Sequence, residues 1–319
     1  MSKHWANIGE AGVLSGMRFG AWVYERLGRV VFNILLFPAI AYFFLRRGVA
    51  RKSSREFLQR VKQQYPDSIR GEPGPWLSFR HFYSFGQAVL DKYAAWMHPP
   101  EIIRMDPAEQ AGLFSLVESK QGCLLLGSHF GNLEYSRGLA HRHPELVINV
   151  LIYDQHSANF VRLLSEAAPE SRMNLMQVTD LDLDLAIRLK DRVAQGEWLL
   201  IAGDRVPVGE SDNVEAAEFF GAPADFPIGP FVLASLLHCP VYLMHCYLKE
   251  GEYQLSMQKF ADDVRATRSG GRRSYAAYVQ DYATQLEQRV AEAPLQWFNF
   301  YDFWQQPATS DKAGKLEPS

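Results

Sequence analysis

The sequence is poor in cysteine, which limits the ways in which the fold can be held together. Its 319 residues include three cysteines, Cys123, Cys239 and Cys246, and each lies in an apolar run. Three thiols without metal-binding spacing exclude a disulfide framework and a cysteine-based zinc site, and they are typical of reduced core thiols in a cytoplasmic compartment. We therefore expect a hydrophobic core to stabilise the fold, and a chain of this length can bury a large one.

Strong charge of either sign is also missing. The formal net charge is −3 and there is no basic stripe with interleaved aromatic residues, so the sequence argues against a nucleic-acid partner. Hydrophobic residues make up 47% and charged residues 22%, as in ordinary globular proteins. Gly-x-Ser-x-Gly, P-loop and His-Glu-x-x-His patterns do not occur in the sequence, so it carries none of these hydrolase, nucleotide-binding or zinc-protease signatures.

A hydrophobic run of full transmembrane length is lacking too. The apolar stretch Val30 to Leu45 has 16 residues between Arg29 and Arg46. As a helix it would measure roughly 24 Å, short of the ~30 Å hydrocarbon core of a bilayer. It could be a buried core helix, a shallow interfacial anchor or a short span, and Val13 to Leu27 could form an amphipathic helix on the same surface. Because basic residues suited to anionic headgroups follow it, we predict that residues 1–60 form an N-terminal membrane-associated helical segment.

The body of the chain alternates between short apolar runs and helical patterns. Runs typical of buried strands occur at Cys123–Leu126, Leu146–Tyr153, Met173–Val178, Glu197–Ala202 and Cys239–Leu248. Helices are expected at Ser53–Gln64, Trp76–Met97 and Arg272–Glu292, and His81 in the second of them is predicted to lie at the surface. This order predicts an α/β fold with a mostly parallel central sheet flanked by helices, formed by residues 61–305 and followed by a disordered tail at 306–319.

A histidine and a carboxylate stand out in the loop after the first of these strands. Gly127 ends the strand, and His129 and Glu134 follow it five residues apart, with Asn132 as the expected N-cap of a helix over Leu133–His141. Side chains at i and i+5 do not share a helix face, so the two can meet only if Glu134 reaches back from the first turn. A carboxylate bonded to one ring nitrogen fixes the histidine tautomer and makes the other nitrogen a better proton acceptor.

A second polar element follows the strand Glu197–Ala202. Asp204 and Arg205 come directly after it, and ligands of open α/β sheets bind beyond the carboxyl ends of the strands. Phe220 and Gly221 belong to a Phe-Phe-Gly stretch that precedes a further expected helix. The Asp204–Arg205 pair could bind a substrate or could tie down its own turn, and both interpretations remain open at this point.

Together these segments resemble the lipid A biosynthesis (late) acyltransferase family of the lysophospholipid acyltransferase superfamily. The octapeptide from Gly127 to Glu134 is similar to the family's His-x4-Asp/Glu motif, and Asp204-Arg205, the Phe-Phe-Gly stretch and Cys239-Pro240-Val241 resemble its later elements. The resemblance covers roughly residues 10 to 305. Near its end the chain has Tyr301-Asp302-Phe303-Trp304 in place of the family's basic pair, so the acceptor could differ from the bis-phosphorylated lipid A precursor.

The resemblance implies a membrane-associated acyltransferase that needs no cofactor or metal. It would transfer a fatty acyl group from a thioester of acyl carrier protein or coenzyme A to a hydroxyl or amine of a lipid or glycolipid, at the cytoplasmic face of the bacterial inner membrane. His129 would be the general base and Glu134 its orienting partner. The substrate-binding residues implied by the resemblance are Gly131, Asn132, Asp204, Arg205, Phe220 and Gly221.

Two alternatives stay open beside this interpretation. A metal-dependent hydrolase could use His129, Glu134, Asp204 and His156, although the sequence gives no tight cluster of ligands. A degenerate relative could bind lipid at a membrane without catalysis, and the intact His129 and Glu134 argue against that loss.

Overall fold

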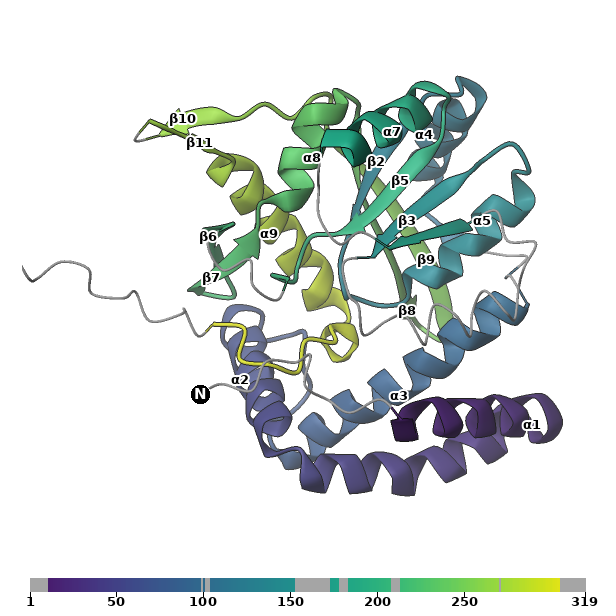
Figure 1. Ribbon diagram of the computed structural model, residues 1–319. Helices are drawn as coiled ribbons and strands as arrows, with labels where there is room; N and C mark the ends of the chain where they lie inside the picture. The colour runs from purple at the N-terminus through teal and green to yellow at the C-terminus, as the bar shows by residue number, and fades with distance from the viewer. Residues whose placement is uncertain are drawn as a thin grey trace, which may run out of the picture.

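The fold is built on one large sheet with helices on both of its faces (Figure 1). The computed structural model describes residues 11–98, 100, 104–152, 173–177, 183–207, 213–269 and 271–304. The seven strands lie in the order β1 (Arg104–Met105), β9 (Glu252–Ala261), β8 (Val241–Lys249), β2 (Cys123–Gly127), β5 (Trp198–Ala202), β3 (Ile148–Ile152) and β4 (Met173–Gln177). From β8 to β4 all neighbours pair in parallel, and β9 is antiparallel to β8. The predicted α/β class with a mostly parallel central sheet is confirmed.

The central strand β2 is apolar throughout because both faces of the sheet are covered. Leu124 and Leu126 belong to one buried core cluster, and Cys123 and Leu125 belong to the other. The first cluster is covered by α2 (Gly48–Gln64), α7 (Leu183–Ala194), α8 (Gly229–Leu237) and α9 (Ala276–Glu292). The second is covered by α4 (Pro107–Glu118) and α5 (Arg137–Arg142). A parallel strand buried on both faces reads as a continuous apolar run, which is how the sequence identified it.

Two predicted helices differ from the structure at their first residues. The helix expected over Leu133–His141 begins as the 3-10 turn η2 (Leu133–Ser136), and Ser136 rather than Asn132 takes the N-cap position of α5. The helix expected from Arg272 begins at Ala276, because β11 (Arg272–Ser274) pairs with β10 (Thr267–Ser269) in a short hairpin. In both cases local pairing or turn geometry displaces the start of the helix. The tail predicted at 306–319 lies outside the described residues.

At the N-terminus, α1 (Ala11–Arg46) is a pair of helical arms rather than one rod. The arms meet at Gly28, whose backbone angles (φ 80°, ψ 173°) are not helical. Glycine tolerates a positive φ because it has no Cβ, so it is the natural residue at this break. The arms fold toward each other, since a Cβ atom on Gly20 would lie 3.0 Å from the ring of Phe32.

The second arm of α1 lies along α3 (Pro75–Met97), antiparallel to it (Figure 1). An ion pair joins Arg29 to Asp91 at 3.1 Å, and the hydroxyl of Tyr83 donates to the carbonyl of Asn33 at 3.0 Å. α3 in turn packs on α2, on η2 and on the 3-10 turn η4 (Pro294–Gln296). This helix therefore separates the apolar N-terminal arms from the edge of the sheet where the predicted site residues lie.

Candidate active site

His129 and Asp204 are neighbours because the strands that precede them are neighbours. Gly127 at the end of β2 pairs with Ala202 at the end of β5, so the loops that follow both strands emerge at the same edge of the sheet. His129 Nδ1 lies 2.7 Å from Asp204 Oδ1, and the backbone N–H of His129 donates to the same carboxylate at 3.0 Å. The histidine thus has a carboxylate partner, which is the arrangement expected for Glu134.

Asp204 is fully buried and is surrounded by hydrogen-bond donors. Besides His129, its carboxylate accepts from Trp297 Nε1 at 3.1 Å and from Asn299 Nδ2 at 3.0 Å. Burial by itself would raise the pKa of Asp204, but the charge and hydrogen bonds of His129, together with the charge of Arg205, lower it to about 2. The carboxylate is therefore ionised at neutral pH and accepts every bond that it makes.

The geometry sets the tautomer of His129. Because ionised Asp204 can only accept, Nδ1 of His129 carries the proton and Nε2 keeps its lone pair. The side chain of His129 is 33% exposed, so the imidazole is mostly packed within the protein and reaches solvent with part of its surface. Burial, followed by the positive charge of Arg205, lowers its pKa below the usual value, and Asp204 opposes this effect. At neutral pH the ring is a neutral proton acceptor.

The loop from Ser128 to Asn132 is held by its own backbone. Gly131 has φ 72°, and a Cβ atom there would lie 2.1 Å from the carbonyl oxygen of Cys246, so glycine is required for this close approach. The N–H groups of the loop donate within the protein: His129 to Asp204, Phe130 to Ser128 Oγ at 3.4 Å, Gly131 to Gln296 O at 2.8 Å and Asn132 to Cys246 O at 2.6 Å. These amides hold the loop in place, and their hydrogens point away from an incoming substrate.

Arg205 bonds to the same C-terminal segment that contacts Asp204 and His129. Its Nε donates to Asn299 Oδ1 at 2.6 Å, and one terminal nitrogen donates to the carbonyl of Phe298 at 2.7 Å. Phe298 N–H in turn donates to the carbonyl of His129 at 3.0 Å. The C-terminal segment after η4 therefore links Arg205, Asp204 and His129 into one network.

Glu134 is bonded to Lys92 of α3 and not to His129. Lys92 Nζ donates to Glu134 Oε1 at 2.9 Å. With its amide oriented to satisfy both neighbours, buried Asn132 donates to Glu134 Oε2 at 2.9 Å and accepts from the Lys92 backbone N–H at 3.1 Å. Among the hydrogen bonds of the described residues, none joins His129 to Glu134. Because η2 packs on α3, the Glu134 carboxylate lies beside Lys92 and pairs with its ammonium group.

His81 is buried, in contrast to the predicted surface position. Its Nε2 lies 2.9 Å from the carbonyl oxygen of Trp297, and its Nδ1 lies 3.0 Å from the hydroxyl of Ser54. The carbonyl can only accept, so Nε2 carries the proton and Ser54 donates to Nδ1. Burial lowers the pKa of His81 to about 4. This histidine helps to position the segment that carries Trp297.

Phe220 and Gly221 lie apart from this network. They form the turn between β6 (Val214–Phe219) and β7 (Ala222–Pro227), where Phe220 is buried against Phe57 and Gly221 packs on Gln64 of α2. Their position in the core gives them a packing role. A substrate contact for these two residues remains a prediction.

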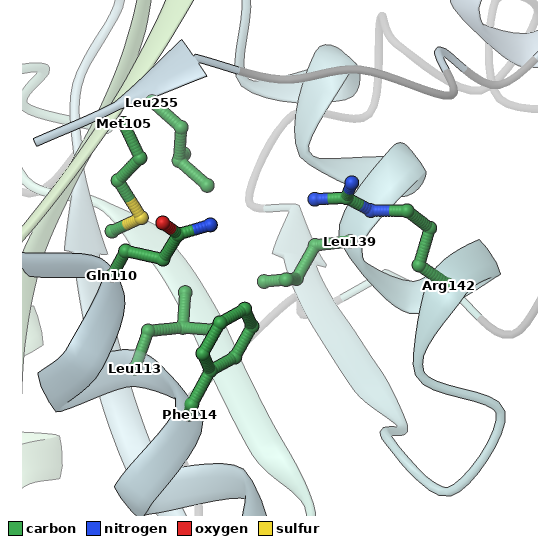
Figure 2. A pocket seen from close by; sticks show the side chains of 7 residues that line it. All are labelled: Met105, Gln110, Leu113, Phe114, Leu139, Arg142 and Leu255. Carbon is green, nitrogen blue, oxygen red and sulfur yellow. The ribbon is translucent and has the colours of Figure 1, made fainter. Parts of the chain in front are cut away.

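A small pocket lies elsewhere on the molecule (Figure 2). It is lined by Met105, Gln110, Leu113, Phe114, Leu139, Arg142 and Leu255, on the face of the sheet that α4 and α5 cover. It includes none of the predicted site residues. Within the described ranges, no group of three His, Cys, Asp or Glu side chains could hold a metal ion. His156, which the metal-hydrolase interpretation would use, lies outside those ranges.

The fold and the site define a class of protein, an α/β protein with a carboxylate-bound histidine at the carboxyl edge of its sheet. The chain belongs to the bacterial lipid A biosynthesis acyltransferase family, whose profile matches residues 39–306. This match covers most of the chain and confirms the family resemblance seen in the sequence. A comparison with curated proteins gives no match.

Proposed function

We propose that this protein transfers a fatty acyl group from a thioester to a hydroxyl or amine of a lipid or glycolipid acceptor. Membership of the acyltransferase family supports the reaction class. The observation that carries the assignment is the bond of 2.7 Å between His129 Nδ1 and buried Asp204, which leaves Nε2 as a neutral base on a partly exposed imidazole.

The proposed steps follow from this tautomer. Nε2 of His129 takes the proton from the acceptor hydroxyl or amine as the acceptor oxygen or nitrogen forms a bond to the thioester carbonyl carbon. The carbonyl oxygen becomes an oxyanion. Its collapse breaks the carbon–sulfur bond, and the leaving thiolate takes the proton back from His129. Asp204 keeps the ring in place and stabilises the imidazolium that forms between these events. The sequence of steps needs no metal or cofactor.

The donor in this proposal is acyl carrier protein or coenzyme A, and the acceptor keeps its chains in the cytoplasmic leaflet of the bacterial inner membrane. The exposed apolar surface of α1 supports the membrane location. Val30 is 73% exposed, Ile34 65% and Leu45 72%. Large contiguous apolar patches are rare on the surfaces of soluble proteins and mark sites that bind a membrane or a partner. Within Trp22–Arg46 an 18-residue window has a mean hydropathy of 1.8, so the stretch is long and apolar enough, by length and composition only, to cross a membrane.

The geometry of α1 favours an interfacial anchor over a span. The break at Gly28 separates the first arm from the apolar stretch Val30 to Leu45, which alone is short for the ~30 Å hydrocarbon core, and the second arm is tied to α3 by the Arg29–Asp91 pair. An arm docked along the protein in this way would lie in the membrane surface with its outer side in lipid. Within the membrane-associated segment proposed for residues 1–60, α1 is the part that would face lipid, because α2 packs on the core of the acyltransferase domain proposed for residues 61–305.

Replacing His129 by Ala tests the function. We expect turnover of an acyl carrier protein thioester, with bacterial glycolipids in detergent as acceptors, to fall roughly 10²–10⁴-fold, the usual contribution of a general base. Binding of the acyl donor should change little. The matched control is His238→Asn, because His238 is an exposed histidine at the end of α8 and Asn tolerates its left-handed backbone (φ 51°). Near-normal turnover of the His129→Ala protein would refute the role of His129.

A further inference from the structure

The proposed reaction creates a negative charge, and the backbone N–H groups of residues 129 to 132 already donate to other acceptors. Attack on the thioester places an oxyanion near His129 Nε2, and enzymes usually stabilise such a charge with donors fixed beforehand. The N–H groups of residues 129 to 132 all donate to acceptors within the protein. These four N–H groups are therefore not available to the oxyanion, whereas a side-chain cation beside the loop could stabilise it.

Lys92 is a partly exposed cation that contacts the η2 turn directly after this loop. Its ammonium group donates to Glu134 Oε1 at 2.9 Å, and the two side chains are 30% and 21% exposed. His129, which precedes Glu134 by five residues, is 33% exposed on the same loop. α3 brings Lys92 to η2, and Asn132 holds Glu134 from behind with a bond of 2.9 Å to Oε2. The lysine is thus positioned by a carboxylate that is itself fixed.

We propose that Lys92 is a catalytic residue that stabilises the oxyanion of the acyl-transfer transition state, and that Glu134 positions its ammonium group. An ammonium group has three N–H donors, and the bond to Glu134 uses one of them. This inference rests on the proposed function. It gives the carboxylate of the His-x4-Glu motif a different task from orienting the histidine, since Asp204 already bonds to the imidazole.

The electrostatics of His129 agree with this placement. Three charged groups act on the imidazole: Asp204 raises its pKa, and Arg205 and Lys92 lower it. This effect agrees with the contact between Lys92 and Glu134, which places the lysine on the η2 turn that follows the His129 loop. Arg205 is the other cation, but its Nε and one terminal nitrogen already donate to Asn299 and Phe298. Removing the charge of Lys92 should stabilise the imidazolium as well as destabilise the oxyanion.

The experiment compares Lys92→Met, Lys92→Arg and the matched control Lys190→Met, which changes an exposed lysine of α7. Two donors are used, dodecanoyl-acyl carrier protein and dodecanoyl-N-acetylcysteamine, with bacterial glycolipids in detergent as acceptors. For Lys92→Met we expect kcat to fall about 10²–10³-fold with little change in KM, the usual effect of losing one oxyanion donor. The loss should be the same with both donors, and Lys92→Arg should recover part of it. The acid limb of the pH–rate profile should move to higher pH, which a purely structural role would not cause.

Each contrary result has a distinct meaning. A loss confined to KM, or one that vanishes with the phosphate-free N-acetylcysteamine donor, would show that Lys92 binds a phosphate ester and would overturn the inference. So would normal kcat in Lys92→Met when His129→Ala is inactive. If the unaltered protein transfers no acyl group from either donor, the proposed function fails, and this inference fails with it. Thermal melting of each variant separates a catalytic loss from unfolding.

Discussion

Exchanging Asp204 for Asn tests the His129–Asp204 pair with the smallest possible change. The amide of asparagine has the shape of the carboxylate, but its oxygen accepts hydrogen bonds whereas its NH₂ group donates them. Oδ1 of Asp204 faces His129 Nδ1 at 2.7 Å, and Oδ2 faces Trp297 Nε1 and Asn299 Nδ2 at 3.1 and 3.0 Å. All of these partners are donors. Whichever way the amide turns, its NH₂ group meets a donor.

Both orientations of the amide impair the protein. If the NH₂ group faces the imidazole, Nδ1 must accept, the proton moves to Nε2, and His129 no longer acts as a base. If it faces Trp297 and Asn299, their buried donors lose an acceptor, at about 1–3 kcal/mol for an unsatisfied group. The pKa of Asp204 is lowered from 3.8 to about 2, which corresponds to about 2 kcal/mol of stability at pH 7 that Asn cannot supply. That stability is present above pH 4 and is lost as the pH falls toward 2.

We therefore expect Asp204→Asn to lower kcat roughly 10²–10⁴-fold, the range of general-base catalysis, and to reduce the free energy of unfolding by about 2 kcal/mol. The assays are thioester turnover and urea denaturation at pH 7. Glu134→Gln is the matched comparison, because Gln can still accept a hydrogen bond from Lys92 and should lose activity about 10-fold or less. The opposite ranking, with Glu134→Gln nearly inactive and Asp204→Asn nearly normal, would refute the assignment and restore Glu134 as the orienting carboxylate.

Two further predictions concern stability and location. The pKa of His81 and of His245 is lowered to about 4, chiefly by burial, so the unfolded chain binds more protons than the folded one between pH 6.5 and 4. The free energy of unfolding should be constant above pH 7 and should fall by about 3 kcal/mol per histidine as the pH drops to 4, which urea denaturation across that range measures; a flat profile would contradict it. Removing residues 1–47 should abolish sedimentation with anionic liposomes, because the side chains of Val30, Ile34 and Leu45 are exposed. The thermal melt should stay cooperative at a lowered temperature, because the truncation also removes the contacts of Ile40 and Arg29 with α3. Full unfolding of the truncated protein would show instead that α1 is part of the core.

Much of the fold could be predicted because its signals are local. A run such as Cys123–Gly127 is buried on both sides, and its composition alone is typical of a central parallel strand. The first residue of a helix is harder to predict where the preceding residues pair in a hairpin. Nothing in the composition of Arg272–Ser274 shows that these residues pair with Thr267–Ser269, so the sequence predicts the start of α9 at Arg272, four residues before its observed start at Ala276.

The partner of His129 could not be predicted from spacing, because the sheet and not the chain brings it close. Glu134 is five residues away in sequence, whereas Asp204 is 75 residues away. β3 and β4 lie between β2 and β5 in the chain, yet β2 and β5 are neighbours in the sheet. Only the strand order shows which polar side chain beyond a strand end faces the histidine. One available signal was that Asp204, like His129, directly follows a buried strand.

The strand order also explains why the His-x4-Glu motif is present in the sequence although its histidine and glutamate bond to different partners. The His129 ring bonds to Asp204, which follows β5, and the Glu134 carboxylate bonds to Lys92 of α3. The His129 loop thus contributes a base and α3 contributes a cation, and each is held by its own carboxylate. A base alone would accept the proton of the acceptor, and a cation alone would bind an anion. Acyl transfer needs a group for each charge that forms in the transition state, and two separate carboxylates allow the two groups to be held independently.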